Sequence, residues 1–178
     1  MIEISYETMA TLISVVWCAA RAAVWLKNKR VDWRRELRLL LVYICILVVV
    51  RFTFFPFGKV DGRIRPLIFD AKRARPFRIN LIPFVYMTDY DTRQEAVLHF
   101  VGNTLMFLPL GIAFPAVYKG LDTHKKALAA GVGASLLIEI LQLPFCDRVS
   151  DIDDLILNSL GYALGYLIFW GVKRLRRQ

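Results

Sequence analysis

The sequence predicts an all-α integral membrane protein, a bundle of about five transmembrane helices with an extracytoplasmic basic loop. Two observations carry this prediction: 57% of the 178 residues are hydrophobic, and the mean hydropathy is +0.46. This apolar content is too high for a soluble domain of this length and is typical of several membrane spans. Because the chain has no internal repeat, Ser/Gly linker or low-complexity tract, we expect residues 1–178 to form a single membrane domain.

Five hydrophobic runs of roughly 17–22 residues have the length that a helix needs to cross the apolar core of a bilayer. These runs cover residues 9–26, 39–57, 97–118, 127–145 and 155–172. The third run is the least regular, because Pro109 and Pro115 each remove a backbone donor and favour a bend.

Lysine and arginine side chains set the predicted orientation. With five spans, the basic segments at residues 27–38, 119–126 and 173–177 share one side of the membrane. Cytoplasmic segments of membrane proteins carry an excess of Lys and Arg. We therefore expect a multi-pass protein with its N-terminus outside and its C-terminus in the cytoplasm.

The loop at residues 58–96 falls on the outer side although it is strongly basic. Its basic residues are Lys59, Arg63, Arg65, Lys72, Arg73, Arg75, Arg78 and Arg93. Two interpretations remain open: the loop binds anionic lipid head groups or polyanionic wall polymers, or it is solvated and has no specific partner. Residues 80–84 are apolar and include a proline, so we expect this part to dip into the interface or fill a cavity as a partly re-entrant loop. Asp91, followed by Gln94, predicts a capping box at the start of the third helix.

Polar side chains interrupt the last four hydrophobic runs, and these residues are Arg51, Asn103, Glu139, Gln142, Asp154 and Asn158. A charged side chain near the centre of a membrane helix costs about 2.5–3.5 kcal/mol, so an ionisable residue there is a candidate for a functional site. At roughly 1.5 Å of rise per residue, one polar residue in each of these four spans lies about 5–9 Å below its outer end. We therefore expect the polar side chains to converge on one pocket in the outer leaflet.

Spacing along the helices places these polar residues on shared faces. His99 and Asn103 are four residues apart, so they share a face. Asp154 and Asn158 have the same spacing. The Gly161-x-x-x-Gly165 pattern continues the second face and lets another helix approach it closely.

A purely structural interpretation of the polar layer stays open beside the functional one. Glu139 and Arg51 would then form an ion pair between two helices, and the asparagines would be interhelical hydrogen-bonding residues that contribute about 0.6 kcal/mol each. On its own, His99 is best interpreted as an interfacial histidine. The three cysteines are isolated and form no CxxC motif or Cys/His cluster, so we expect no metal site and no cofactor.

Short motifs in a fixed order give a more specific expectation. They are Asn80-Leu81-Ile82-Pro83-Phe84, then Asn103 with Phe107-Leu108-Pro109-Leu110-Gly111, then Glu139-x-x-Gln142, Arg148-x-x-Asp151 and Asp154-Leu155-Ile156-Leu157-Asn158-x-x-Gly161. This order resembles the VanZ-like membrane protein family, with a core at about residues 80–170. That family is named for a protein that lowers susceptibility to teicoplanin, a lipoglycopeptide that binds peptidoglycan precursors. The resemblance implies a bacterial cell-envelope protein of the cell membrane that is linked to antibiotic resistance.

The residues also indicate a class of ligand. A polar pocket with apolar walls suits an amphipathic molecule whose head enters the pocket while its acyl chain stays in the bilayer. We therefore expect a membrane lipid, a lipid-linked envelope precursor or a lipoglycopeptide-related ligand as partner, and no nucleic acid. The expected ligand-binding residues are Asn80, Asn103, Glu139, Gln142, Arg148, Asp151, Asp154 and Asn158.

The alternative is an intramembrane hydrolase or transferase that acts on a lipid-linked envelope substrate. In that case Glu139 and Asp154 would form the catalytic acid/base pair, with one carboxyl group kept neutral by burial. No serine has an adjacent histidine to activate it, which favours the binding protein. A transporter is disfavoured because the five spans show no inverted repeat.

Overall fold

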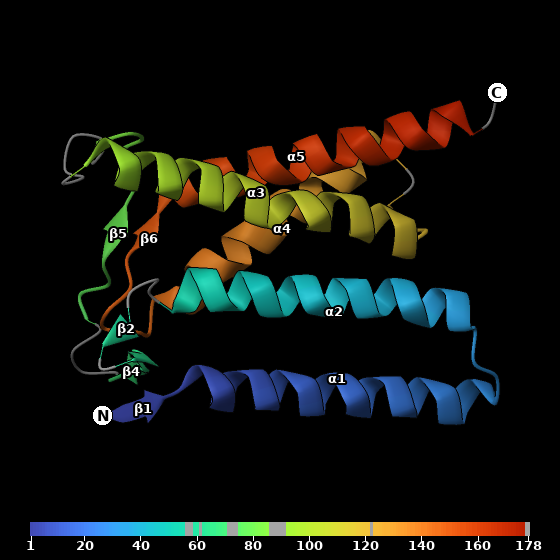
Figure 1. The fold of residues 1–178 in the computed structure, drawn as a ribbon, viewed down its shortest axis with the longest axis horizontal. Coiled ribbons are helices and arrows are strands. Elements are labelled where there is room, and N and C mark those ends of the chain that lie inside the picture. The colour runs from blue at the N-terminus through green and yellow to red at the C-terminus, as the bar shows by residue number, and fades with distance from the viewer. Residues whose placement is uncertain (56–58, 61, 71–74, 86–91, 122, 177–178) are drawn as a thin grey trace.

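Five helices form the body of the molecule in the computed structural model (Figure 1). The structure describes residues 1–55, 59–60, 62–70, 75–85, 92–121 and 123–176. The helices are α1 (Tyr6–Asn28), α2 (Trp33–Phe54), α3 (Arg93–Val117), α4 (His124–Gln142) and α5 (Ile152–Leu175). Consecutive helices run in opposite directions, so α3 and α5 run parallel (Figure 1). The predicted number of helices is confirmed, and α3 continues through both of its prolines.

Each helix begins after a side chain that accepts a backbone N–H of the first turn. These N-cap residues are Ser5, Asp32, Thr92, Thr123 and Asp151. For α3 the cap differs from the predicted Asp91–Gln94 box. The hydroxyl of Thr92 accepts from the Glu95 N–H at 3.2 Å, and Asp91 lies outside the described residues. A threonine hydroxyl satisfies an otherwise unpaired N–H donor at the start of a helix.

Four of the five helices, α1, α2, α3 and α5, are long and apolar enough to cross a membrane. The remaining helix, α4, is 19 residues long, starts with a basic turn and carries polar residues on its buried face. Of the five predicted spans, four are therefore candidate spans by length and composition, and α4 is a shorter, more polar helix that also runs from one end of the bundle to the other. In α4 the buried positions include Ser135, Glu139 and Gln142, which lowers its apolar content but gives it polar contacts inside the bundle.

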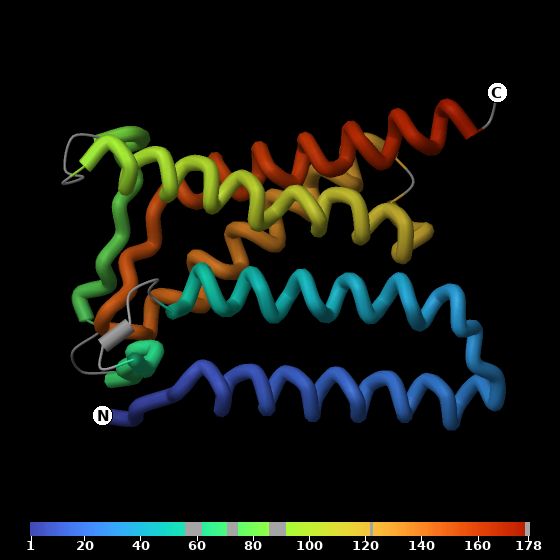
Figure 2. Tube along the Cα trace, viewed as in Figure 1, coloured from blue at the N-terminus to red at the C-terminus, as the bar shows by residue number. Residues whose placement is uncertain are grey.

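The positions of α1 and α4 differ sharply. Helix α1 lies at the edge of the bundle beside α2 and buries no residue completely. Helix α4 crosses the bundle obliquely, from α5 at one end to the C-terminal end of α2 at the other (Figure 2). At that second end the Gln142 amide donates to the Thr53 carbonyl at 2.8 Å. The outer faces of α1 and α2 are apolar and exposed, as expected for helices that contact lipid.

The end of the bundle that holds the N-terminus carries short strands, so the all-α prediction was incomplete. Strand β1 (Ile2–Ile4) pairs antiparallel with β4 (Leu67–Phe69), and β2 (Lys59–Val60) pairs antiparallel with β3 (Arg63–Ile64). Strand β5 (Ile79–Asn80) pairs in parallel with β6 (Ser150–Asp151) (Figure 1). Strands of two or three residues are too short to show the alternating pattern by which a sequence reveals them. They tie the 58–96 loop to the N-terminus and to the link between α4 and α5.

Helices α3 and α5 touch backbone to backbone. A Cβ atom added to Gly161 would lie 1.9 Å from the Thr104 carbonyl oxygen, and one on Gly165 would lie 2.0 Å from the Leu108 carbonyl oxygen. Such distances exclude any side chain at these positions, so the predicted close approach at the glycine pair is confirmed. Next to Gly161 on α5, Tyr162 is fully buried, and its side chain fills the core between α3 and α4.

Replacing Gly161 with alanine should destabilise the protein, because the new methyl group would force α3 and α5 apart. Overpacking of this kind typically costs about 1–3 kcal/mol, which corresponds to a fall in Tm of roughly 2–12 °C for a chain of this length. Thermal unfolding of the purified protein in detergent measures the effect. Gly171→Ala is the matched control, since a Cβ there meets nothing within 4 Å. Equal Tm values for the two variants would contradict the packing described.

Candidate functional site

Asp151 is the centre of a polar network at the strand-bearing end of the bundle. Its carboxylate oxygen Oδ1 accepts from the Asn80 amide at 3.0 Å and from the Asp153 N–H at 2.9 Å. Its own N–H donates to Oε2 of Glu139 at 2.8 Å. Asp151 therefore joins the β5 segment, the start of α5 and the end of α4.

A second carboxylate fixes the turn that follows β5. Both oxygens of the buried Asp153 accept from the Phe84 N–H, at 2.9 and 3.1 Å. The Asn80 side chain accepts from the Ile82 N–H at 3.1 Å, and the Phe84 ring stacks on Phe100 of α3. Phe84 has a φ of 60°, a left-handed conformation that a non-glycine residue adopts when its contacts hold it there. Sequence analysis did not select Asp153, because its role depends on a backbone donor distant in sequence.

The apolar segment at residues 81–85 points outward. Leu81 is 72% exposed and Ile82 is 64% exposed, and neither lines the pocket described below. Of the two placements that the sequence left open, this geometry favours the surface of the bundle over the filling of a cavity. An exposed apolar turn next to membrane helices suits the interface between lipid and water.

Asp154, Asn103 and His99 meet where α5 lies against α3. The Asn103 amide donates to Oδ1 of Asp154, and Nε2 of His99 lies 3.1 Å from the same oxygen. The two α3 residues are also 3.4 Å apart, between the Asn103 amide and His99 Nε2. His99 was interpreted as an interfacial histidine, but it belongs to this cluster. The signal in the sequence was its four-residue spacing from Asn103, which places both side chains on the face towards α5.

A pocket of about 640 Å³ opens beside this cluster, between α2, α3 and the link from α4 to α5. Its charged, imidazole and amide lining residues are His99, Asn103, Gln142, Asp147, Arg148, Asp151 and Asp154, and Thr53 adds a hydroxyl group. Three of these residues, Asp147, Arg148 and Asp151, come from the link at the end of the bundle. The apolar lining includes Val48, Leu105 and Met106, which lie further along α2 and α3. The pocket therefore combines charged and amide side chains with apolar side chains, most of which come from α2 and α3.

Arg148 is the only arginine or lysine among the pocket's described lining residues. It is half-buried, and its Nε has no hydrogen-bond partner among the described residues. Burial lowers the pKa of its guanidinium, while the carboxylates of Asp147 and Asp154 act in the opposite direction. An arginine stays charged under these conditions, so the pocket presents one cation beside three carboxylates. In the described part of the chain, no group of three or more His, Cys, Asp or Glu side chains could hold a metal ion.

Five of the eight predicted ligand-binding residues line the pocket, namely Asn103, Gln142, Arg148, Asp151 and Asp154. The other three lie behind it and are buried. Asn80 and Glu139 hold Asp151 in place, and Asn158 donates to the Ser135 hydroxyl at 3.1 Å. The expected single cluster of Asn103, Glu139 and Asn158 is thus divided between a lining layer and a supporting layer.

Arg51, which the structural interpretation paired with Glu139, makes contacts at the end of α2. It donates to the Phe55 carbonyl at 3.1 Å, and its guanidinium lies over the rings of Tyr6 and Phe52. The Glu139 carboxylate is directed at the Asp151 backbone instead. Glu139 therefore supports the link between α4 and α5.

Comparison with known protein families decides the relationship. The family model described as VanZ/LLP1 matches residues 40–174, well over half of the chain. The chain belongs to the VanZ/LLP1 family. The match starts upstream of the core expected at about residues 80–170 and so includes most of α2 and the basic loop. Neither the comparison with curated proteins nor that with solved structures found a match. Family membership and four apolar helices together support a VanZ-like, multi-pass membrane protein.

Glu139→Leu should destabilise the protein more than Glu139→Gln. Leucine removes the acceptor of the Asp151 N–H, and a buried unpaired donor costs about 1–3 kcal/mol, whereas glutamine keeps an acceptor oxygen. Thermal unfolding of the purified variants measures the difference. Glu95→Leu is the control, because Glu95 is an exposed glutamate in the first turn of α3 that does not line the pocket. If the leucine and glutamine variants unfold at the same temperature, Glu139 does not hold the link.

Proposed function

We propose that the protein binds the polar head of an amphipathic ligand, a membrane lipid, a lipid-linked envelope precursor or a lipoglycopeptide-related molecule, in the 640 Å³ pocket. In doing so it lowers the susceptibility of the cell to teicoplanin-like antibiotics. The observation that carries this proposal is the composition of the lining, which combines charged and amide side chains with apolar side chains of α2 and α3. Membership in the VanZ/LLP1 family supports the cell-envelope setting.

The apolar wall gives an acyl chain a route to the bilayer. Leu98 and Leu105 line the pocket and are also largely exposed on the outer surface of α3. Val48 of α2 is similarly placed across the pocket. A chain between these residues replaces lipid contacts with protein contacts, while the head group stays among hydrogen-bonding side chains.

The charges in the pocket narrow the chemistry of the head group. Asp147, Asp151 and Asp154 accept hydrogen bonds, and Arg148 donates them. Three carboxylates around one guanidinium disfavour a polyanion and favour a head group rich in hydroxyl, amide or amine groups. Glycans and peptide amines of lipid-linked envelope precursors and of lipoglycopeptides have these groups.

The proposed orientation follows from the Lys and Arg distribution, with the N-terminus outside and the C-terminus in the cytoplasm. The pocket then opens in the outer leaflet, where glycopeptide antibiotics and wall precursors meet. The 58–96 loop is expected on the same side in this orientation, and anionic head groups or wall polymers are the proposed partners of its basic residues.

A second candidate function, an intramembrane hydrolase or transferase, is favoured by the contact between His99 and Asp154. A carboxylate that orients an imidazole is a recurring arrangement for general-base catalysis. His99 would take up a proton and Asp154 would hold its ring in place. Glu139, the other carboxylate considered from the sequence, does not line the pocket and supports the link instead.

Asp154→Asn should abolish protection against teicoplanin in a susceptible bacterium that expresses the protein. Asparagine keeps an acceptor for Asn103 and removes the charge that the ligand would contact. The minimal inhibitory concentration should return to that of cells without the protein, at equal amounts of folded protein. Asp32→Asn makes the same chemical change outside the pocket, at the N-cap of α2, and should keep full protection because asparagine also caps helices. A folded Asp154→Asn protein with full protection would refute the binding site.

Mass spectrometry of envelope lipids separates the two candidate functions. A binding protein leaves lipid masses unchanged when it is overexpressed. An enzyme produces a new species or removes one, and this change should disappear in His99→Gln and in Asp154→Asn while remaining in Asp32→Asn. A lipid change that depends on both pocket residues would replace the binding proposal with the enzyme.

A further inference from the structure

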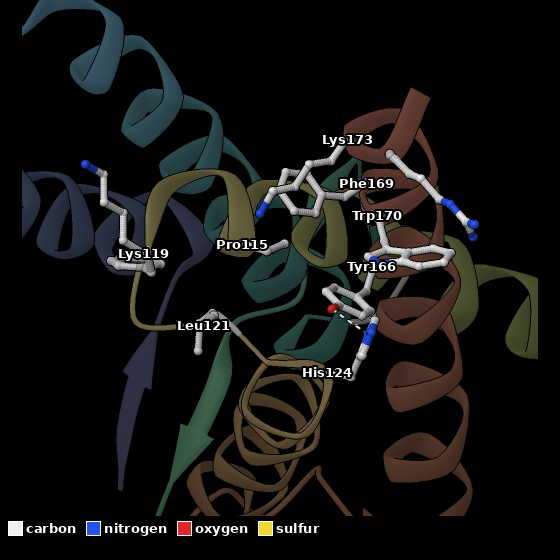
Figure 3. A pocket seen from close by; sticks show the side chains of 10 residues that line it. Pro115, Lys119, Leu121, His124, Tyr166, Phe169, Trp170 and Lys173 are labelled. Carbon is white, nitrogen blue, oxygen red and sulfur yellow. Dashed lines mark hydrogen bonds between the residues drawn. The ribbon is translucent and has the colours of Figure 1, made fainter. Parts of the chain in front are cut away.

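A second pocket, of about 660 Å³, lies at the opposite end of the bundle from the carboxylate-lined pocket. It is formed by the C-terminal ends of α3 and α5, residues of the link between α3 and α4, and the first residue of α4 (Figure 3). The two pockets share no lining residue. The chemistry of the second one is therefore a separate question.

The lining of this second pocket combines cations with aromatic rings. Lys119, Lys173 and Arg174 line it, and no carboxylate does among the described residues. The Lys173 ammonium lies 5.8 Å from the centre of the Phe169 ring, and the Arg174 guanidinium lies 5.5 Å from that of Trp170. These cation–π contacts hold the two charges in place without neutralising them, so both can still bind an anion.

The base of the pocket is fixed by a hydrogen bond. The Tyr166 hydroxyl and Nδ1 of His124 are 2.8 Å apart, and the His124 ring also packs edge-on against Trp170 (Figure 3). This contact joins the start of α4 to α5. The N-terminal end of α4 at this pocket adds a partial positive charge to that of the side chains.

We infer that this pocket binds the phosphate-bearing head group of an anionic phospholipid in the leaflet at the C-terminal side of the bundle. The cations match a phosphate, and the aromatic side chains match the boundary between head group and acyl chain. The neighbouring loop between α1 and α2 is also basic, so an anionic lipid is attracted to this end of the molecule as a whole. The pocket then provides the specific contact.

The test measures binding of short-chain phosphatidylglycerol to the full-length protein in neutral detergent micelles. The comparison ligands are phosphatidylcholine of the same chain length and inorganic phosphate. Saturable binding of phosphatidylglycerol, with much weaker binding of the other two, is expected. If inorganic phosphate competes at concentrations similar to those of phosphatidylglycerol, the lipid assignment is overturned in favour of a soluble anion.

The matched variants separate the pocket from general charge attraction. Lys173→Gln combined with Arg174→Gln should weaken binding about 25-fold, since each cation near an anionic head group contributes about fivefold. Arg34→Gln combined with Arg35→Gln removes the same charge at the same end of the bundle but outside the pocket, and should change binding little. Equal losses in the two double variants would overturn the proposal.

A third variant tests the pocket without changing the net charge. Trp170→Leu removes the ring under Arg174 and should weaken phosphatidylglycerol binding while the protein keeps its elution profile in size-exclusion chromatography. Should the double charge variant fail to fold, this variant decides alone. Unchanged affinity in folded Trp170→Leu would contradict the inference.

Discussion

The backbone contact between α3 and α5 sets the position of the Asp154, Asn103 and His99 cluster in the candidate site. Gly161 and Gly165 let α5 pack directly on the carbonyl groups of Thr104 and Leu108. Because the two helices run parallel, this register brings the start of α5 beside the first turns of α3. Asp154 can reach Asn103 only in this register. Within a membrane, where apolar burial gives little drive for association, close packing of small residues supplies the attraction instead.

The site has a supporting layer as well as a lining layer. Glu139, Asn80 and Asp153 do not line the pocket; each accepts a hydrogen bond from a backbone N–H of the link or of the β5 turn. Irregular backbone at the edge of a membrane bundle needs such partners, since its N–H groups have no helix to pair with. The buried carboxylates therefore make it possible for two non-helical segments to pair in parallel beside the pocket, and this pairing fixes the position of Asp151.

The sequence predicted the helices and the polar residues well because both depend on local pattern. A hydrophobic run of sufficient length predicts a helix. A polar residue inside such a run is conspicuous because placing it in a membrane costs free energy. The division of those residues into lining and support was not predictable. Glu139 and Asp154 look alike in sequence, and their roles differ because one faces the backbone of the link and the other faces α3. Strand pairs of two residues and the oblique path of α4 likewise depend on tertiary contacts.

The charges that line the pockets at the two ends of the bundle agree with the predicted orientation. Carboxylates with a single arginine line the pocket near the N-terminus, whereas lysine and arginine with aromatic rings line the pocket near the C-terminus. Lys119, Lys173 and Arg174 of the second pocket are among the basic residues on which the proposed orientation rests, so the cationic pocket and the orientation express one charge asymmetry. A bundle inserted with its cationic pocket at the cytoplasmic leaflet, where anionic lipids are enriched, places its carboxylate-lined pocket on the side of the envelope precursors. The proposed outer ligand and the proposed inner lipid are thus consistent with a single insertion.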